Sequence, residues 1–68
     1  MTTTILITMT TNSTARDTGT VARICGLRAH QLRHNGGKVV VAEVDPSDVD
    51  AVCDRLDAAY QVAAYEVQ

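Results

Sequence analysis

The chain has 68 residues, a net charge of −2, and 46% hydrophobic residues that include two tyrosines but no phenylalanine or tryptophan. A chain of this length forms one domain, and its small aliphatic core often needs the help of oligomerisation. Two cysteines are too few for the disulfide framework of a small secreted protein, so we expect free thiols.

The first eleven residues, MTTTILITMTT, contain no basic residue and about five apolar ones. A signal peptide needs an apolar run of about 7–15 residues, and a membrane-spanning helix needs about 20. We therefore expect a cytoplasmic protein without a membrane segment.

The first predicted strand runs from Thr3 to Thr8, where the side chains alternate between two faces. One face carries Ile5, Ile7 and Met9, and the other carries Thr4, Leu6 and Thr8. The polar run 10–18 predicts a loop, with a helix that begins between Thr14 and Thr18.

This first helix is predicted to continue to His34, because apolar residues recur at helical spacing. Its apolar stripe comprises Val21, Ile24, Cys25, Ala29 and Leu32. Gly19 and Gly26 each weaken a helix by about 1 kcal/mol relative to Ala, so each is either tolerated or required by a close contact with the backbone. Arg28 falls within the stripe, and we expect its stem to reach the surface or its guanidinium to pair with a carboxylate.

The run Asn35-Gly36-Gly37 predicts the end of this helix, and the β-branched run from Val39 to Val44 predicts a buried central strand. Asp45 then has the place of an N-cap and Pro46 that of the first helical residue, so a second helix begins here. Its apolar stripe comprises Val49, Val52, Cys53, Leu56, Ala59 and Tyr60.

A third strand is predicted over residues 61–67, where Val62, Ala64 and Glu66 alternate with Ala63, Tyr65 and Val67. The predicted fold class is α/β, a two-layer sandwich in the order β-α-β-α-β with a three-stranded sheet and two helices. Strands joined through a helix favour parallel crossovers. A second copy can extend the sheet at its exposed edges, or Lys38, Glu43 and Glu66 can protect those edges from pairing.

Charge is unevenly distributed along the chain. Five basic residues stand against one acidic residue through Lys38, and one basic residue stands against seven acidic ones afterwards. If the first helix continues to His34, its outer face carries a basic stripe of Arg16, Arg23, His30 and His34, with Leu27 lying among them. Asp50, Asp54 and Asp57 form an acidic row on the second helix. These two sets predict a partner-binding surface, a nucleic-acid contact through the basic helix, or two solvated faces.

Catalytic and metal-binding patterns are weak. His30 and His34 have the four-residue spacing of a metal pair on a helix, but the neighbouring arginines disfavour a cation. Both cysteines fall within apolar stripes, where thiols are unreactive. The sequence therefore predicts no enzyme, no metal site and no cofactor.

The segments Ile5 to Thr10, Asp17 to Leu27 (DTGTVARICGL), HNGG and KVVVAEV resemble ACT domains and related small ferredoxin-like regulatory domains. The matching residues of the central segment are Gly19, Val21, Ala22, Arg23, Ile24, Gly26 and Leu27. The resemblance implies a ferredoxin-like variant that lacks one strand, side-by-side dimers, and a small effector such as an amino acid near Asn12, Ser13 and Gly19.

Taken together, these features favour a small non-catalytic regulatory protein that acts through protein–protein contacts. Its partner is either a second copy of itself, in a homodimer or larger oligomer, or a larger host protein. The alternatives are an ACT-like effector sensor and a nucleic-acid-binding accessory protein.

Overall fold

The computed structural model describes the backbone of residues 1–10 and 16–68 and the side chains of residues 1–10 and 17–68. Four strands and two α-helices alternate in the order β-α-β-β-α-β, with a short 3₁₀ turn before β2 and another before α2. The elements are β1 (Thr3–Met9), α1 (Arg16–Cys25), η1 (Ala29–Gln31), β2 (Leu32–His34), β3 (Val39–Val44), η2 (Pro46–Asp48), α2 (Val49–Ala58) and β4 (Val62–Val67).

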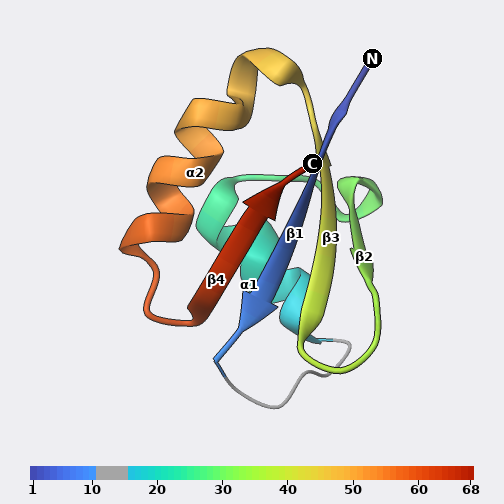
Figure 1. The fold of residues 1–68 in the computed structure, drawn as a ribbon. Coiled ribbons are helices and arrows are strands. Elements are labelled where there is room, and N and C mark those ends of the chain that lie inside the picture. Colours follow the sequence, from blue (N-terminus) through green and yellow to red (C-terminus); the bar gives the residue numbers. More distant parts are fainter. Residues whose placement is uncertain (11–15) are drawn as a thin grey trace.

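The sheet has four strands in the spatial order β2-β3-β1-β4, and every neighbouring pair is antiparallel (Figure 1). Strands that are joined through a helix do run parallel, but another strand separates them in each case: β3 lies between β1 and β2, and β1 lies between β3 and β4. The α/β class is confirmed. The predicted three-stranded sheet is wrong, because the fourth strand, β2, lies in the segment that was expected to be helical.

Helix α1 ends nine residues before the predicted end at His34. Gly26 has a φ of +69°, a left-handed conformation that a glycine adopts without steric cost. The backbone N–H of Leu27 then donates to the carbonyl of Ala22 at 3.0 Å, which is the hydrogen bond of a Schellman helix end. The expected packing of Ala29 and Leu32 along a helical stripe is therefore wrong.

Beyond this helix end the chain forms a hairpin of β2 and β3. Asn35-Gly36-Gly37 is its turn and not a helix terminus, with φ angles of +79° and +54° at the two glycines. The Asn35 N–H donates to the Val39 carbonyl at 2.9 Å, and the Val39 N–H donates to the Gly36 carbonyl at 3.1 Å. The hairpin places β3 beside β1 and leaves the short strand β2 at one edge of the sheet.

The start of the second helix agrees with the prediction. Asp45 Oδ1 accepts hydrogen bonds from the backbone N–H of Ser47 at 3.1 Å and from its hydroxyl at 2.9 Å. Pro46 opens the 3₁₀ turn η2, which leads directly into α2. The backbone hydrogen bond from Ser47, together with that from the hydroxyl, lowers the pKa of Asp45 below its usual value.

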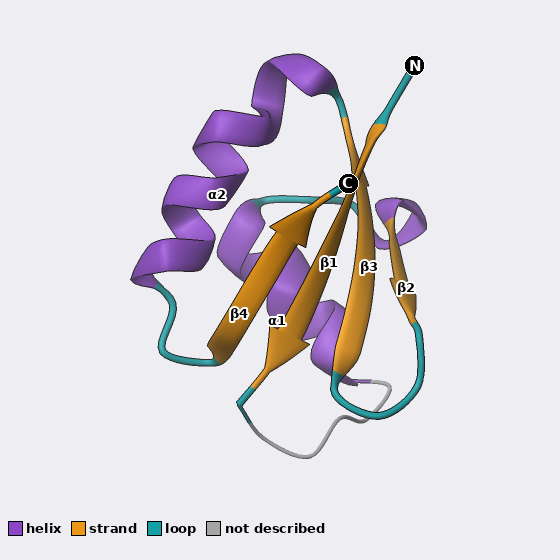
Figure 2. Ribbon diagram, in the orientation of Figure 1, coloured by secondary structure: helices purple, strands orange, loops and turns teal. Residues whose placement is uncertain are grey.

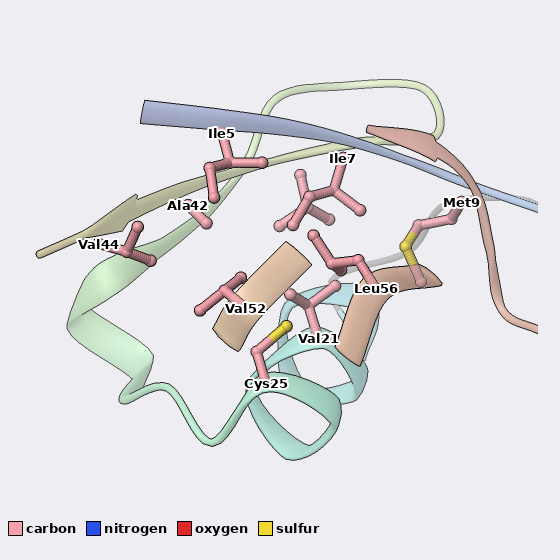
Figure 3. Close-up of a cluster of buried hydrophobic side chains, with 10 residues drawn as sticks. Ile5, Ile7, Met9, Val21, Cys25, Ala42, Val44, Val52 and Leu56 are labelled. Carbon is pink, nitrogen blue, oxygen red and sulfur yellow. The ribbon is translucent and has the colours of Figure 1, made fainter. Parts of the chain in front are cut away.

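Both helices pack on the same face of the sheet, and the core lies between the two layers (Figure 2). In Figure 3, Ile5, Ile7 and Met9 point from β1 toward Val21 and Cys25 of α1. From α2, Val52 and Leu56 complete the core and are 3% and 1% exposed. Tyr60 is 85% exposed, so its predicted place in the apolar stripe of the second helix is wrong.

Strand β4 forms the edge beside β1 and contains one irregularity. Thr8 pairs with Ala64, but Met9 pairs with Val62, so Ala63 is an extra residue of a β-bulge. Val62 therefore packs against the core on the same side as Tyr65. The strict alternation that was predicted for residues 61–67 would have placed these two side chains on opposite faces.

Candidate functional site

The face of the sheet opposite α1 and α2 is the candidate site. Side chains alternate along a strand, so the residues between the core positions project to this side. We call it the open face, and it comprises Thr4, Leu6 and Thr8 of β1, Arg33 of β2, Val39, Val41 and Glu43 of β3, and Ala64 and Glu66 of β4.

The centre of the open face is apolar. Leu6 lies directly opposite Val41, and Thr8 lies opposite Val39 in the β1–β3 register. Leu6 and Val39 are half-buried, and Val41 is 4% exposed although it lies outside the core cluster. Solvent-facing sides of antiparallel sheets usually carry polar side chains, so this composition is unusual for a face that only meets water.

A row of paired residues crosses the open face from one edge to the other. Arg33 is the register partner of Val41, Val41 of Leu6, and Leu6 of Glu66. A cation at one edge and an anion at the other therefore flank two aliphatic side chains. Both charged residues are exposed.

Glu43 occupies one end of the open face and is held by two threonines. The Thr4 hydroxyl is 2.8 Å from one carboxylate oxygen of Glu43 and 2.9 Å from the other, and the Thr2 hydroxyl donates at 3.1 Å. These hydrogen bonds satisfy a half-buried carboxylate on the surface of the sheet. Glu43 is thus positioned by β1 and is not a free charge.

The open face is hollowed beside Leu6. This hollow has a volume of about 200 Å³ and lies between β1, β3 and β4, where Thr8, Val39 and Ala64 contribute to its lining. A hollow of this size is too small for a typical cofactor, which needs about 300–1,000 Å³. It is large enough to receive a side chain from another molecule.

A second hollow, of about 230 Å³, lies between the end of α1 and the start of α2. Cys25, Asp48 and Arg55 line it, and Arg55 Nη1 donates to the Ile24 carbonyl at 3.5 Å. Burial raises the pKa of the Cys25 thiol above its usual value, despite the opposing effect of Arg55. The thiol is therefore protonated at neutral pH and is a poor nucleophile.

A third cluster joins α2 to β4. The Tyr65 hydroxyl donates to Asp57 Oδ1 at 2.8 Å, and this hydrogen bond, with desolvation and the carboxylate charge, raises the pKa of Tyr65 to about 12. Desolvation also raises the pKa of the nearby Cys53 thiol, against the opposing effect of its hydrogen bond with Tyr65. Both cysteines are free. This cluster holds the edge strand to the helix and supplies no thiolate at neutral pH.

The predicted basic stripe does not exist as a helix face. Arg23 is exposed on α1, but His30 lies in η1 and His34 in β2, so the two histidines do not share a helical turn. Leu27 packs against the core. The side chain of Arg16 lies outside the described residues.

Other predicted residues have simpler positions. Asp50, Asp54 and Asp57 are exposed on α2, as the helical spacing predicted. Arg28 is exposed beyond the end of α1, and its backbone N–H donates to Gln31 Oε1 at 3.0 Å, so the expected problem of a buried guanidinium does not arise.

The residues of the effector hypothesis are only partly described. Asn12 and Ser13 lie outside the described residues. Gly19 is exposed on α1, and among the described atoms nothing lies within 4 Å of the position that a Cβ would take. The described part of the chain thus shows no internal contact that requires a glycine here.

Sequence reasoning did not find the open face as a site. The alternation in β1 placed Leu6 opposite the core, but the row from Arg33 to Glu66 depends on the register of β2, which was expected to be helical. The sequence signal that could have indicated strand β2 is the alternation of Leu32 and His34 with Arg33.

Comparisons with known proteins return no matching family model, no matching curated protein and no matching solved structure. In the described part of the chain, no helix is long and apolar enough to cross a membrane. The open face is therefore the main basis for a functional proposal.

Proposed function

We propose that this protein is a small, non-catalytic interaction protein that associates with a second copy of itself through the open face. The observation that carries the proposal is the apolar centre of this face, where Leu6, Val39 and Val41 lie on the side of the sheet away from both helices. Val41 is already only 4% exposed, so covering this face would remove mainly the remaining exposed surface of Leu6 and Val39 from water. Removal of apolar surface from water is the main driving force of association.

The size of the domain supports self-association. The core of the described residues contains no aromatic side chain among its buried members, and its largest buried residues are Ile5, Ile7, Met9 and Leu56. A second sheet packed on the open face would give β1 and β3 an apolar layer on both sides. Small domains commonly gain stability in this way.

The chemistry of the side chains supports a binding role over catalysis. The two thiols have raised pKa values, and the Tyr65 hydroxyl is occupied by Asp57. Among the described residues, histidine, cysteine and carboxylate side chains do not gather in groups of three that could hold a metal ion.

Analytical ultracentrifugation of Leu6→Lys against Ala58→Lys tests the proposal. Leu6 lies at the centre of the open face, whereas Ala58 is exposed at the end of α2. We expect the unmodified chain and Ala58→Lys to be dimers at micromolar concentration, and Leu6→Lys to be a folded monomer by circular dichroism. A monomeric unmodified chain, or a dimer in all three proteins, would contradict the proposal.

An ACT-like effector sensor is the second candidate, because the element order supports it. The order β-α-β-β-α-β is that of the ferredoxin-like plan, and the hairpin that the sequence seemed to lack is β2–β3. A panel of amino acids in a thermal-shift assay tests this candidate: an effector raises the melting temperature, and no shift across the panel would count against it. The nucleic-acid hypothesis has no comparable support, because its basic stripe is divided among three elements.

A further inference from the structure

Arg33 and Glu66, two of the three charged residues of the open face, lie at equal distances from its midline. In the strand order β2-β3-β1-β4, the midline of the sheet runs between β3 and β1. Arg33 on β2 and Glu66 on β4 are therefore each one strand beyond the central pair, Val41 and Leu6. The row has a cation and an anion at mirror positions about the midline.

Arg33 and Glu66 of the same chain are too far apart to form an ion pair. Three strand spacings separate them, which is about 14 Å at the usual 4.8 Å between neighbouring strands. Among the described residues Arg33 has no ion-pair partner, and Glu66 accepts a hydrogen bond only from the Gln68 side chain, at 3.2 Å. Each charge is therefore available to a partner molecule.

We propose that two copies pack open face to open face about a two-fold axis that runs parallel to the strands, midway between β3 and β1. This inference rests on the proposed self-association and specifies its geometry. The rotation exchanges the two edges of the sheet, so Arg33 of each copy faces Glu66 of the other. At the centre, Leu6 of each copy packs against Val41 of the other, and the interface is isologous.

The charges select this axis over the perpendicular one. An axis in the same plane but across the strands would place Arg33 against Arg33 and Glu66 against Glu66, and such like-charge contacts oppose association. The parallel axis makes two opposite-charge pairs. Glu43, the third charge of the open face, then faces Thr4 of the second copy, whose hydroxyl already donates to the Glu43 of its own chain.

The dimensions of the molecule fit this arrangement. A specific interface buries about 800 Å² on each partner, which is roughly a fifth of the 4275 Å² that the chain exposes. The broadest face of a molecule measuring 30 × 23 × 20 Å has a projected area of about 690 Å², so an interface of this size uses the whole of that face and its side-chain relief. Packed sheets lie about 10 Å apart, a gap that an arginine and a glutamate side chain can span together.

Charge reversal tests the axis, because each substitution acts twice in an isologous dimer. Arg33→Glu alone, or Glu66→Arg alone, creates two like-charge contacts, and we expect the dimer dissociation constant to rise at least about tenfold in low salt. The double variant Arg33→Glu/Glu66→Arg reverses both ends of the row and should return the constant to within about threefold of the original. Sedimentation across a concentration series measures all four proteins.

Mixing the two single variants provides a control against misfolding. In an equimolar mixture, the reversed end of one chain faces the reversed end of the other, and the two unreversed ends face each other. Both contacts then pair opposite charges, so a heterodimer should form where neither variant dimerises alone. Arg23→Glu and Asp54→Arg make matched charge changes on the exposed surfaces of α1 and α2. We expect both to leave the dissociation constant unchanged.

The outcomes separate this inference from the proposed function. If Leu6→Lys abolishes the dimer but the single charge reversals have no effect, the open face associates about a different axis and this inference is overturned. If Arg23→Glu or Asp54→Arg weakens the dimer while the open-face variants do not, the helices form the interface and both proposals fail. A monomeric unmodified chain also overturns both.

Discussion

Tyr65 and Asp57 connect the edge strand β4 to the last turn of α2 through a hydrogen bond of 2.8 Å. The loop between α2 and β4 separates the two residues in sequence, so the hydrogen bond holds the two ends of this loop together. It also places the tyrosine ring beside Cys53, the half-buried thiol of the same helix.

This hydrogen bond predicts a loss of stability at high pH. Because the pKa of Tyr65 is raised from 10.0 to about 12 in the folded chain, the stabilisation is complete below pH 10 and is lost as the pH rises toward 12. Ultraviolet absorbance of Tyr60→Phe should report a Tyr65 midpoint near 12. In Asp57→Asn/Tyr60→Phe the midpoint should fall toward 10, and an unchanged midpoint would mean that the carboxylate does not cause the shift.

Alanine at Gly19 and at Gly26 should change stability in opposite directions. Gly26 has a φ of +69°, where a Cβ costs about 1–2 kcal/mol, so Gly26→Ala should be destabilised by about that amount. Gly19 lies within α1 with no described atom near its Cβ position, so Gly19→Ala should gain about 0.5–1 kcal/mol. Urea denaturation of both variants measures the difference, and equal signs would contradict this account of the helix end.

The hydrogen bonds to Asp45 at the start of the second helix predict a contribution to stability that is lost at low pH. Because hydrogen bonds from Ser47 lower the pKa of Asp45 in the folded chain, its stabilisation is present above the unfolded value of 3.8 and is lost as the pH falls through the folded value. Asp45→Asn keeps an acceptor at the cap but does not titrate. Thermal melts between pH 2 and pH 6 should therefore show a smaller acid-induced decrease for Asp45→Asn than for the unmodified chain, and identical decreases would contradict the prediction.

Two valine-to-alanine substitutions should differ in their cost to stability, because one lies in the core and the other at the edge of the sheet. Val52 is 3% exposed, and removing its methyl groups should cost about 2–3 kcal/mol from lost burial and the cavity left behind. Val67 is 41% exposed on β4, and the same substitution should cost less than about 1 kcal/mol. Such domains have only about 0.05–0.15 kcal/mol of stability per residue, so Val52→Ala should melt at a much lower temperature in calorimetry.

Local signals in the sequence predicted β1, β3, the cap of α2 and β4. These signals depend only on residues that are close in sequence. They are the alternation of Ile5 and Ile7, the β-branched run of β3 and the Asp45-Pro46 pair. The acidic row on α2 was predicted for the same reason, because helical spacing places Asp50 and Asp54 on one side wherever the helix packs.

Gly26 is a local signal for the end of α1, but only the tertiary structure decided that a strand comes after it. The residues from Ala29 to His34 suit a helix by spacing, but Leu32 and His34 pair with Ala42 and Val40 of β3, and this contact between distant residues stabilises a three-residue strand that local preference does not favour. The same pairing places Arg33 in one row with Leu6 and Glu66. The sequence by itself determined which side chains are apolar and which are charged. The register of the four strands decided that Arg33, Leu6 and Glu66 lie on one face of the sheet, because strand pairing joins residues that are distant in sequence.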